Sequence, residues 1–303
     1  MSFTVVIPTY NAGDIWSEVI GALQGQSINP DKIIVVDSSS TDNTVELARA
    51  AGFETHTIDK KDFDHGGTRS FALGFVVTGI VVFLTQDAIL NDARAVENLL
   101  GAFDNDDVGA AFGRQLPHKN ANPLAIYARN NSYGCEGYLT DLKSSYPSGF
   151  RKAFLSNSFA AYRCSVLRRF GGFPSKLILG EDSYIAAKVL LSGGSVAYVA
   201  DALVRHSHNY SILEEFKRYF DIGVFHETQK WMLEELGSVE GEGVKFALGQ
   251  IRFLMSRSEY YYVLVSLLAS LAKFIGYRMG RNYHVFSVKQ CRNFSMYKSY
   301  WNR

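Results

Sequence analysis

The sequence predicts an α/β fold, with a mostly parallel sheet covered by helices on both faces and a C-terminal helical region after it. Over residues 1–210, short apolar runs alternate with segments of helical period, and the apolar runs are continuous. Continuous apolar strands between helices are typical of a parallel sheet that is buried on both faces. From Ser211 onward the pattern is helical only. We therefore predict an α/β domain over residues 1–210 and a helical region over residues 211–303.

The expected elements follow from local pattern. Strands are predicted at Phe3–Ile7, Lys32–Val36 and Gly79–Thr85, and weaker ones at Val108–Gly113, Ser158–Tyr162 and Val196–Ala200. Residues 14–25 have a helical period, and Thr41 or Asp42 is a plausible N-cap for a helix that runs to Ala51. Further helices are predicted at Ile212–His226, Gln229–Leu236 and Val244–Arg278.

Composition places the chain among ordinary globular proteins. It has 303 residues, 47% hydrophobic and 20% charged, with 31 basic and 30 acidic side chains, which excludes disorder. Cys135, Cys164 and Cys291 are few and widely spaced, so neither a disulfide framework nor a cysteine metal site is expected. The start of the chain has no secretory signal pattern. A cytoplasmic protein is the expectation.

Charge is distributed unevenly. Residues 250–303 carry nine Lys/Arg and one acidic residue, whereas the first 249 residues carry 22 basic and 29 acidic side chains. This basic tail is also aromatic and apolar, which suits an anionic membrane surface, with a homodimer interface or a solvated face as alternatives. Its most apolar run, Tyr260–Ala272, has 13 residues, fewer than the roughly 20 that span a bilayer, so no transmembrane segment is expected. No nucleic-acid recognition fold is apparent.

Carboxylates follow two of the strong strands. Asp37 and Asp87 lie where the strands end, and ligands of parallel sheets bind beyond that edge. The Asp37 carboxylate can accept the imide N–H of uracil or thymine, although an Asp there is also a common helix cap. Asp87 can hold a divalent cation, which would neutralise a leaving diphosphate.

Two further clusters carry chemistry. Glu181 and Asp182 open a helix, where the macrodipole favours carboxylates and where one of them can act as a general base, although simple helix-start chemistry is the alternative. His206 and His208 alternate, so in an extended chain they face opposite ways and at most one is expected to point into a given site. Ordinary loop histidines are the alternative.

The segment Asp64-His-Gly-Gly-Thr-Arg69 offers backbone amides and a guanidinium to an anion such as pyrophosphate. It lacks the Gly-Lys-Ser/Thr of a P-loop and the glycine pattern of a dinucleotide site, so neither of those sites is expected.

The order of the motifs resembles family 2 inverting glycosyltransferases with the GT-A fold, over residues 3–210. The resemblance rests on Val-Ile-Pro-Thr-Tyr-Asn (6–11), Val-Val-Asp-Ser-Ser-Ser-Thr-Asp (35–42), Gly-Gly-Phe-Pro (171–174) and Gly-Glu-Asp (180–182). Within the family, Asp64–Arg69, Thr85–Ala88 and His206–Ser211 look like the bacterial rhamnosyltransferases of cell-surface polysaccharide synthesis.

This resemblance implies roles for individual residues. Asp182 matches the catalytic base, and Asp87 matches the metal-holding second Asp of an Asp-x-Asp signature whose first Asp is here Thr85. His206 or His208 would complete the site for Mg²⁺ or Mn²⁺, with His206 favoured because it follows the strand more directly. Donor contacts are expected from Pro8, Thr9, Tyr10, Asp37, His65, Gly66, Arg69, Gln86 and Glu181.

The resemblance also implies a substrate pair. The donor would be dTDP-β-L-rhamnose and the acceptor a polyprenyl-diphosphate-linked saccharide of O-antigen or another surface polysaccharide, at the inner face of the cell membrane. A UDP-hexose or UDP-N-acetylhexosamine donor is an alternative, because uracil and thymine present the same imide edge. A catalytically inert assembly module is the second alternative, although Asp87, Asp182 and His206 argue against it.

Overall fold

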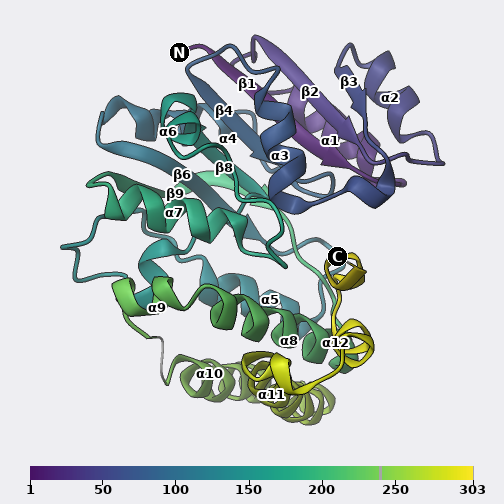
Figure 1. Cartoon of the computed structure of the whole chain (residues 1–303), viewed down its shortest axis with the longest axis vertical. Helices are drawn as coiled ribbons and strands as arrows, with labels where there is room; N and C mark the ends of the chain where they lie inside the picture. The colour runs from purple at the N-terminus through teal and green to yellow at the C-terminus, as the bar shows by residue number, and fades with distance from the viewer. Residues whose placement is uncertain (239–240, 303) are drawn as a thin grey trace.

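In the computed structural model, which describes residues 1–238 and 241–302, nine strands form one sheet with the order β3-β2-β1-β4-β8-β6-β9-β5, and β7 pairs with β9 (Figure 1). The strands are β1 Phe3–Thr9, β2 Lys32–Asp37, β3 Glu54–Thr57, β4 Ile80–Leu84, β5 Ile89–Leu90, β6 Val108–Leu116, β7 Tyr138–Thr140, β8 Phe159–Arg163 and β9 Ser195–Arg205.

The sheet has a parallel half and a mixed half. Strands β3, β2, β1 and β4 are parallel neighbours, and the register sets Thr9 opposite Asp37. Strand β8 runs antiparallel between β4 and β6, while β6 and β9 are parallel. The expected parallel arrangement therefore describes the N-terminal strands, and the sheet as a whole is mixed.

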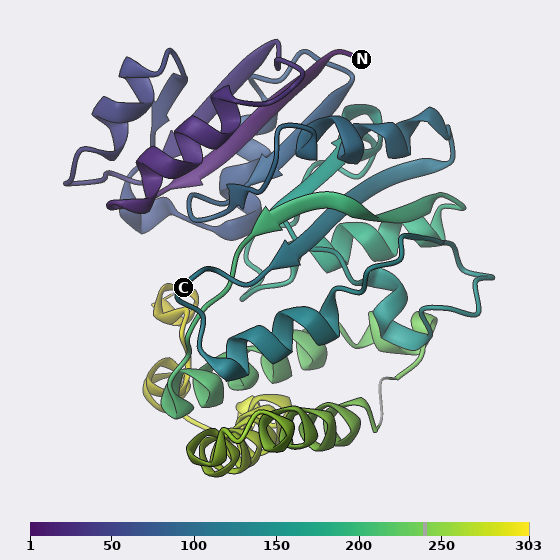
Figure 2. The ribbon, with the colours of Figure 1, turned by 180° about the vertical axis from the view of Figure 1, so that it is seen from behind.

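Helices cover both faces of the sheet, as expected (Figures 1 and 2). The helices of this region are α1 Ile15–Gln24, α2 Thr44–Ala50, α3 His65–Leu73, α4 Ala95–Gly101, α5 Pro123–Ser132, α6 Cys164–Arg169 and α7 Glu181–Leu191. One core joins α1 and α4 to the sheet through Trp16 and Leu99, and the other joins α3, α6 and α7 through Ala72, Leu167 and Ile185.

Short 3-10 turns and local caps complete this region. The turns are Lys60–Asp62, Ala102–Asp104 and Gly149–Ala153 here, and Tyr283–Val285 and Lys298–Asn302 near the C-terminus. The N-cap of α2 is Asn43 rather than Thr41 or Asp42. Asp42, one residue before this N-cap, nevertheless accepts a hydrogen bond from the Thr44 backbone N–H. One of the two predicted side chains therefore stabilises the start of α2.

The C-terminal helices form two further layers beneath the sheet. They are α8 Ile212–Thr228, α9 Lys230–Leu236, α10 Glu242–Ser256, α11 Tyr260–Arg281 and α12 Val288–Phe294. Helices α5 and α8 lie between the sheet and the outer pair α10 and α11 (Figures 1 and 2). The single long helix predicted at 244–278 is wrong: the polar run 256–259 breaks it, and Ser258 has a left-handed φ of 58°.

Helix α11 has two different faces. A Cβ on Gly276 or Gly280 would stand 2.3 or 2.0 Å from a carbonyl oxygen of α8, so these glycines let the two helices touch. The opposite face exposes large apolar side chains. These are Tyr260, Tyr261, Leu264, Leu267, Leu268, Leu271, Phe274 and Ile275.

The apolar run Tyr260–Ala272, too short by itself to span a bilayer, lies within a longer helix. Helix α11 has 22 residues and ends at Arg281, three residues beyond the predicted end at Arg278. Among the described residues, it is the one helix whose length and composition would allow it to cross a membrane. A helix that packs against a soluble core can pass the same test, and this one packs along α8.

Candidate active site

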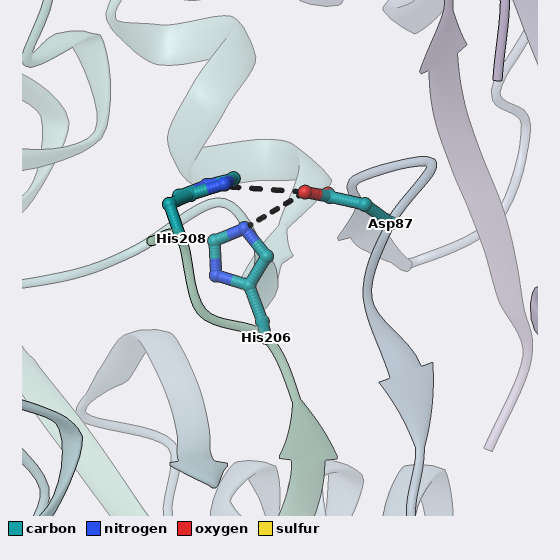
Figure 3. A group of neighbouring side chains, drawn as sticks. All are labelled: Asp87, His206 and His208. Atoms are coloured by element: carbon teal, nitrogen blue, oxygen red, sulfur yellow. Dashed lines mark ion pairs between the residues drawn. The ribbon is translucent and has the colours of Figure 1, made fainter. Parts of the chain in front are cut away.

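Three side chains that could bind a metal ion meet at one edge of the sheet. Strand β5 pairs with the end of β9, with Ile89 opposite Arg205, and this pairing brings Asp87 beside the residues that follow β9. The Asp87 Oδ2 atom lies 3.4 Å from His206 Nε2 and 3.8 Å from His208 Nε2 (Figure 3). One ligand atom from each of the three residues can be chosen so that all lie within 4.8 Å of one another.

Both histidines face Asp87, so the prediction that at most one of them points into the site is wrong (Figure 3). The prediction assumed that the chain stays extended. Strand β9 ends at Arg205, however, and the chain turns before His208, so strand alternation no longer applies. The backbone amide of His118 donates to Ser207 Oγ, which helps to fix this turn.

The orientation of His206 is set by a residue that the sequence analysis missed. His206 Nδ1 lies 2.9 Å from Gln115 Oε1, an amide oxygen that can only accept, so Nδ1 carries the hydrogen. Gln115 Nε2 in turn donates to Ser156 Oγ at 2.9 Å. With its hydrogen on Nδ1, the ring directs Nε2 toward Asp87, where Nε2 donates to the carboxylate when the ring is protonated and can offer its lone pair to a cation when it is not. Such outer partners commonly orient metal-binding histidines.

Charge in this cluster favours an ionised carboxylate. Burial alone would raise the pKa of Asp87, but hydrogen bonding and charge interactions with His206 and His208 lower that pKa far below its usual range. One carboxylate and two imidazoles form a donor set that suits a divalent transition metal.

Asp182 lies in the first turn of α7, on the same hydrogen-bonded frame. It accepts from the backbone amides of Asn157, at 3.2 Å, and Ser183, at 2.8 Å. Burial, followed by the negative charge of Glu181, raises the pKa of Asp182 to about 7. A partly protonated, half-buried carboxyl near neutral pH has the properties of a general base.

Glu181 lies beneath Asp182 in a buried ion pair. Its Oε1 lies 3.0 Å from Arg69 Nη1, with only 5% of the Arg69 side chain and 8% of the Glu181 side chain exposed. Asn157 Nδ2 donates to the same oxygen at 3.1 Å. Burial opposes ionisation of Glu181, yet Arg69 and then His65 hold the pKa of Glu181 below its usual value.

The segment expected to bind pyrophosphate uses its polar groups within the protein. Asp64 caps α3 by accepting from the Gly67 amide, and the Arg69 guanidinium pairs with Glu181. Gly66 packs so closely that an added Cβ would stand 1.9 Å from the Pro174 carbonyl oxygen. The His65 ring meets Tyr297 edge to face, with centroids 4.8 Å apart. A pyrophosphate contact here stays a prediction.

The residues predicted to line the nucleotide base gather at the ends of β1 and β2. Asp37 is buried and accepts from Thr9 Oγ1 at 2.9 Å and from the Ser40 amide at 2.7 Å. Gln86 braces Tyr10 by accepting from its amide and donating to its carbonyl oxygen. Pro8 is half-buried between them.

Lys60 was missed by sequence reasoning, because a lone lysine in a charged loop gives no signal. Its Nζ lies 4.2 Å from the centre of the Tyr10 ring and donates to the phenolic oxygen. The edge where β1 and β2 end, at which a nucleotide is predicted, therefore presents an aromatic ring and a cation side by side.

Comparison with known proteins fits this arrangement. Residues 4–171 match the family described as Glycosyl transferase family 2. The chain belongs to glycosyl transferase family 2. The predicted family and its GT-A fold are thereby confirmed.

Two relatives match over nearly their whole length. The O-antigen chain rhamnosyltransferase RfbN of Salmonella typhimurium is 47% identical over 304 residues, which cover 100% of this chain and 96% of the relative. The O-antigen chain rhamnosyltransferase WbaN of Salmonella anatum is 46% identical over 99% of this chain and 96% of its own length. The predicted resemblance to bacterial rhamnosyltransferases is confirmed by these two proteins.

Solved structures support the fold alone. A mannosyltransferase from Pyrobaculum calidifontis, in complex with GDP-Man and Mn²⁺, superposes with a TM-score of 0.58 at 18% identity and covers 99% of this chain and 84% of its own. Residues 1–349 of TarS from S. aureus, in complex with UDP, give a TM-score of 0.56 at 17% identity, with 94% and 91% covered.

Replacing Gln115 with Leu is expected to weaken Mn²⁺ binding by about 10–100-fold, because the His206 ring loses the partner that orients it. Isothermal titration calorimetry on purified protein measures the affinity. Gln24→Leu, on the exposed face of α1, is the control and should bind as the wild type does. Equal affinities for Gln115→Leu and wild type would show that His206 needs no such support.

The rate of sugar transfer should rise with pH through about 7, because Asp182 accepts a proton only when it is ionised. In the double variant Arg69→Met, Glu181→Gln, the negative charge that raises the pKa of Asp182 is lost, so the rising limb should move to lower pH. A pH profile of kcat/KM for both proteins measures this. Glu46→Gln, exposed on α2, should not shift the profile, and an unshifted double variant would refute the role of Glu181.

Proposed function

We propose that this chain is an inverting rhamnosyltransferase of O-antigen synthesis. It transfers L-rhamnose from dTDP-β-L-rhamnose to a hydroxyl of a polyprenyl-diphosphate-linked saccharide. The observation that carries the proposal is the pairing of a carboxyl of pKa about 7 with an Asp-His-His cluster on one hydrogen-bonded frame. The names of the two full-length relatives support the choice of sugar and pathway.

Asp182 acts as the general base in this proposal. It takes the proton of the acceptor hydroxyl while that oxygen attacks the anomeric carbon, and the nucleoside diphosphate leaves from the opposite face, so that configuration inverts in one step. Asp87, His206 and His208 would hold a divalent cation, which would supply positive charge to the leaving diphosphate. The buried Arg69–Glu181 pair stabilises the first turn of α7, where burial and then the charge of Glu181 raise the pKa of Asp182 to about 7.

We propose Mn²⁺ as the preferred cation. Mg²⁺ favours an all-oxygen shell with several waters, whereas imidazole nitrogen binds first-row transition-metal ions, among which Mn²⁺ is the one that best suits carboxylate oxygen and water as well. Two of the three candidate ligands here are imidazoles. The mannosyltransferase of similar fold forms a complex with GDP-Man and Mn²⁺.

The nucleotide would lie at the ends of β1 and β2, against Tyr10 and Pro8. Lys60 stands beside Tyr10, where a cation can meet the anionic part of the donor. Asp37 is hydrogen-bonded on both oxygens, but each carboxylate oxygen has two lone pairs, so one more donor such as the imide N–H can be accepted on Oδ2.

We further propose that the outer face of α11 docks on the inner face of the cell membrane. The proposed acceptor carries a lipid, and this face presents exposed Leu264, Leu271 and Phe274. Arg252 of α10 and Arg278 of α11 are exposed, so they can contact anionic lipid headgroups. Contact is peripheral in this proposal, because the other face of α11 is packed against α8.

With a lipid-linked acceptor and Mn²⁺, nucleoside diphosphate should be released from dTDP-rhamnose and not from UDP-glucose or UDP-N-acetylglucosamine. EDTA should stop release, and Asp182→Asn should slow it by about 10²–10⁴-fold, since general base catalysis is lost. Release from a UDP-sugar would keep the mechanism and replace the donor. Silence with every donor would favour an inert assembly module.

The triple variant Leu264→Ser, Leu271→Ser, Phe274→Ser should bind vesicles of phosphatidylglycerol and phosphatidylethanolamine at least about tenfold more weakly. Each fully buried Leu or Phe contributes about 1.5–3 kcal/mol to such transfer. Vesicle flotation measures binding. The control is Val77→Ser, Leu139→Ser, two exposed apolar residues elsewhere. Unchanged flotation refutes docking, and a wild-type dimer that the triple variant abolishes would assign the face to a second copy.

A further inference from the structure

A cavity of about 180 Å³ lies next to the metal cluster, on the side of the C-terminal helices. Helices α5, α8, α10 and α11 wall it, and His208 lines it from the cluster. Strand β4, which Asp87 follows, lies between β1 and the strands that lead to the two histidines. The cavity therefore lies on the side of the metal cluster that faces away from the ends of β1 and β2.

The cavity holds unpaired positive charge. Lys273 and Glu215 line it but form an ion pair of 3.0 Å and largely cancel. Arg129 and Arg218 also line it, and within residues 1–238 and 241–302 neither has an ion pair or a hydrogen bond from its guanidinium to another side chain or backbone group. Each instead lies against an aromatic ring, Tyr133 and Tyr210 respectively.

Both guanidiniums lie within electrostatic reach of the reacting groups. His208 lines the cavity together with Arg129 and Arg218, so the cavity borders the metal cluster directly. Tyr133, whose ring Arg129 lies against, is also within the field of Asp182.

A half-buried guanidinium without an anion is costly unless a ligand supplies the anion. Two guanidiniums converging on one space are suited to phosphate oxygens, which they bind through paired N–H donors. The volume is below the roughly 300–1,000 Å³ of pockets for drug-sized ligands, so the space suits one charged group rather than a whole saccharide.

We propose that Arg129 and Arg218 form an anion subsite that binds the phosphate or diphosphate group of the acceptor. The inference rests on the proposed function in one respect, namely that the acceptor is a phosphate-linked saccharide. The subsite holds the acceptor by its charged group and thereby places the hydroxyl near Asp182. The diphosphate of the donor is the other possible source of the same chemistry.

The first test is binding of inorganic pyrophosphate, measured by calorimetry in EDTA so that no metal contributes. Wild type should bind, and Arg129→Gln and Arg218→Gln should each bind about tenfold more weakly or worse, since each loses charge-assisted hydrogen bonds. Arg94→Gln, exposed at the start of α4 and outside the cavity, should match wild type. Equal binding by all four proteins overturns the subsite, whatever reaction the protein catalyses.

The second test separates acceptor from donor. With dTDP-rhamnose and Mn²⁺, a saccharide linked to a lipid diphosphate is compared with the same saccharide as a neutral alkyl glycoside. Arg129→Gln and Arg218→Gln should raise KM about tenfold for the charged acceptor, leave the neutral one unchanged, and leave the donor KM unchanged. A raised donor KM, or an equal loss with both acceptors, overturns the acceptor assignment. Absence of rhamnosyl transfer by wild type would count against the proposed function, while the pyrophosphate result would still stand.

Discussion

The buried ion pair between Arg69 and Glu181 is the interaction on which the site depends. It joins α3 of the N-terminal half to the first turn of α7, and only 5% and 8% of the two side chains are exposed. Removing one partner of such a pair typically costs about 3–5 kcal/mol, because the other charge is left buried. The pair thus holds the first turn of α7 in position. Arg69 also keeps the Glu181 carboxylate ionised, and that negative charge contributes part of the raised pKa of Asp182.

Asp182, the proposed base, and the Asp87–His206–His208 cluster share one hydrogen-bonded frame rather than standing as separate sites. The backbone amide of Asn157 holds Asp182, and its neighbour Ser156 accepts from Gln115, whose amide oxygen holds His206. A shift of residues 156–157 would therefore move Asp182 and His206 together. Because catalysis falls steeply when reacting groups are misplaced by about 1 Å, this coupling gives the site a single geometry.

Site residues that stand within a recognisable local motif could be predicted from the sequence. Asp87 and Asp182 stand at element ends with motifs around them, and their positions emerged from pattern and resemblance. Gln115 could not be found, because it lies within β6 and its partners are 41 and 91 residues away. The sequence predicts Arg69 at an anion because its partner Glu181 lies far along the chain. It predicts only one of His206 and His208 in the site, because alternation in an extended chain does not apply after β9 ends. In each case a tertiary contact decides the role.

The two faces of α11 explain why a helical region follows the α/β fold. Its glycine face packs on α8, and Ala269 and Lys273 of the same inner side line the cationic cavity. An α-helix with its side chains is about 10–12 Å across. The exposed apolar face therefore lies only about one helix diameter from the cavity. Under the two proposals above, one helix therefore serves both steps: its outer face docks on the membrane, and its inner face lines the cavity that binds the charged group of the acceptor.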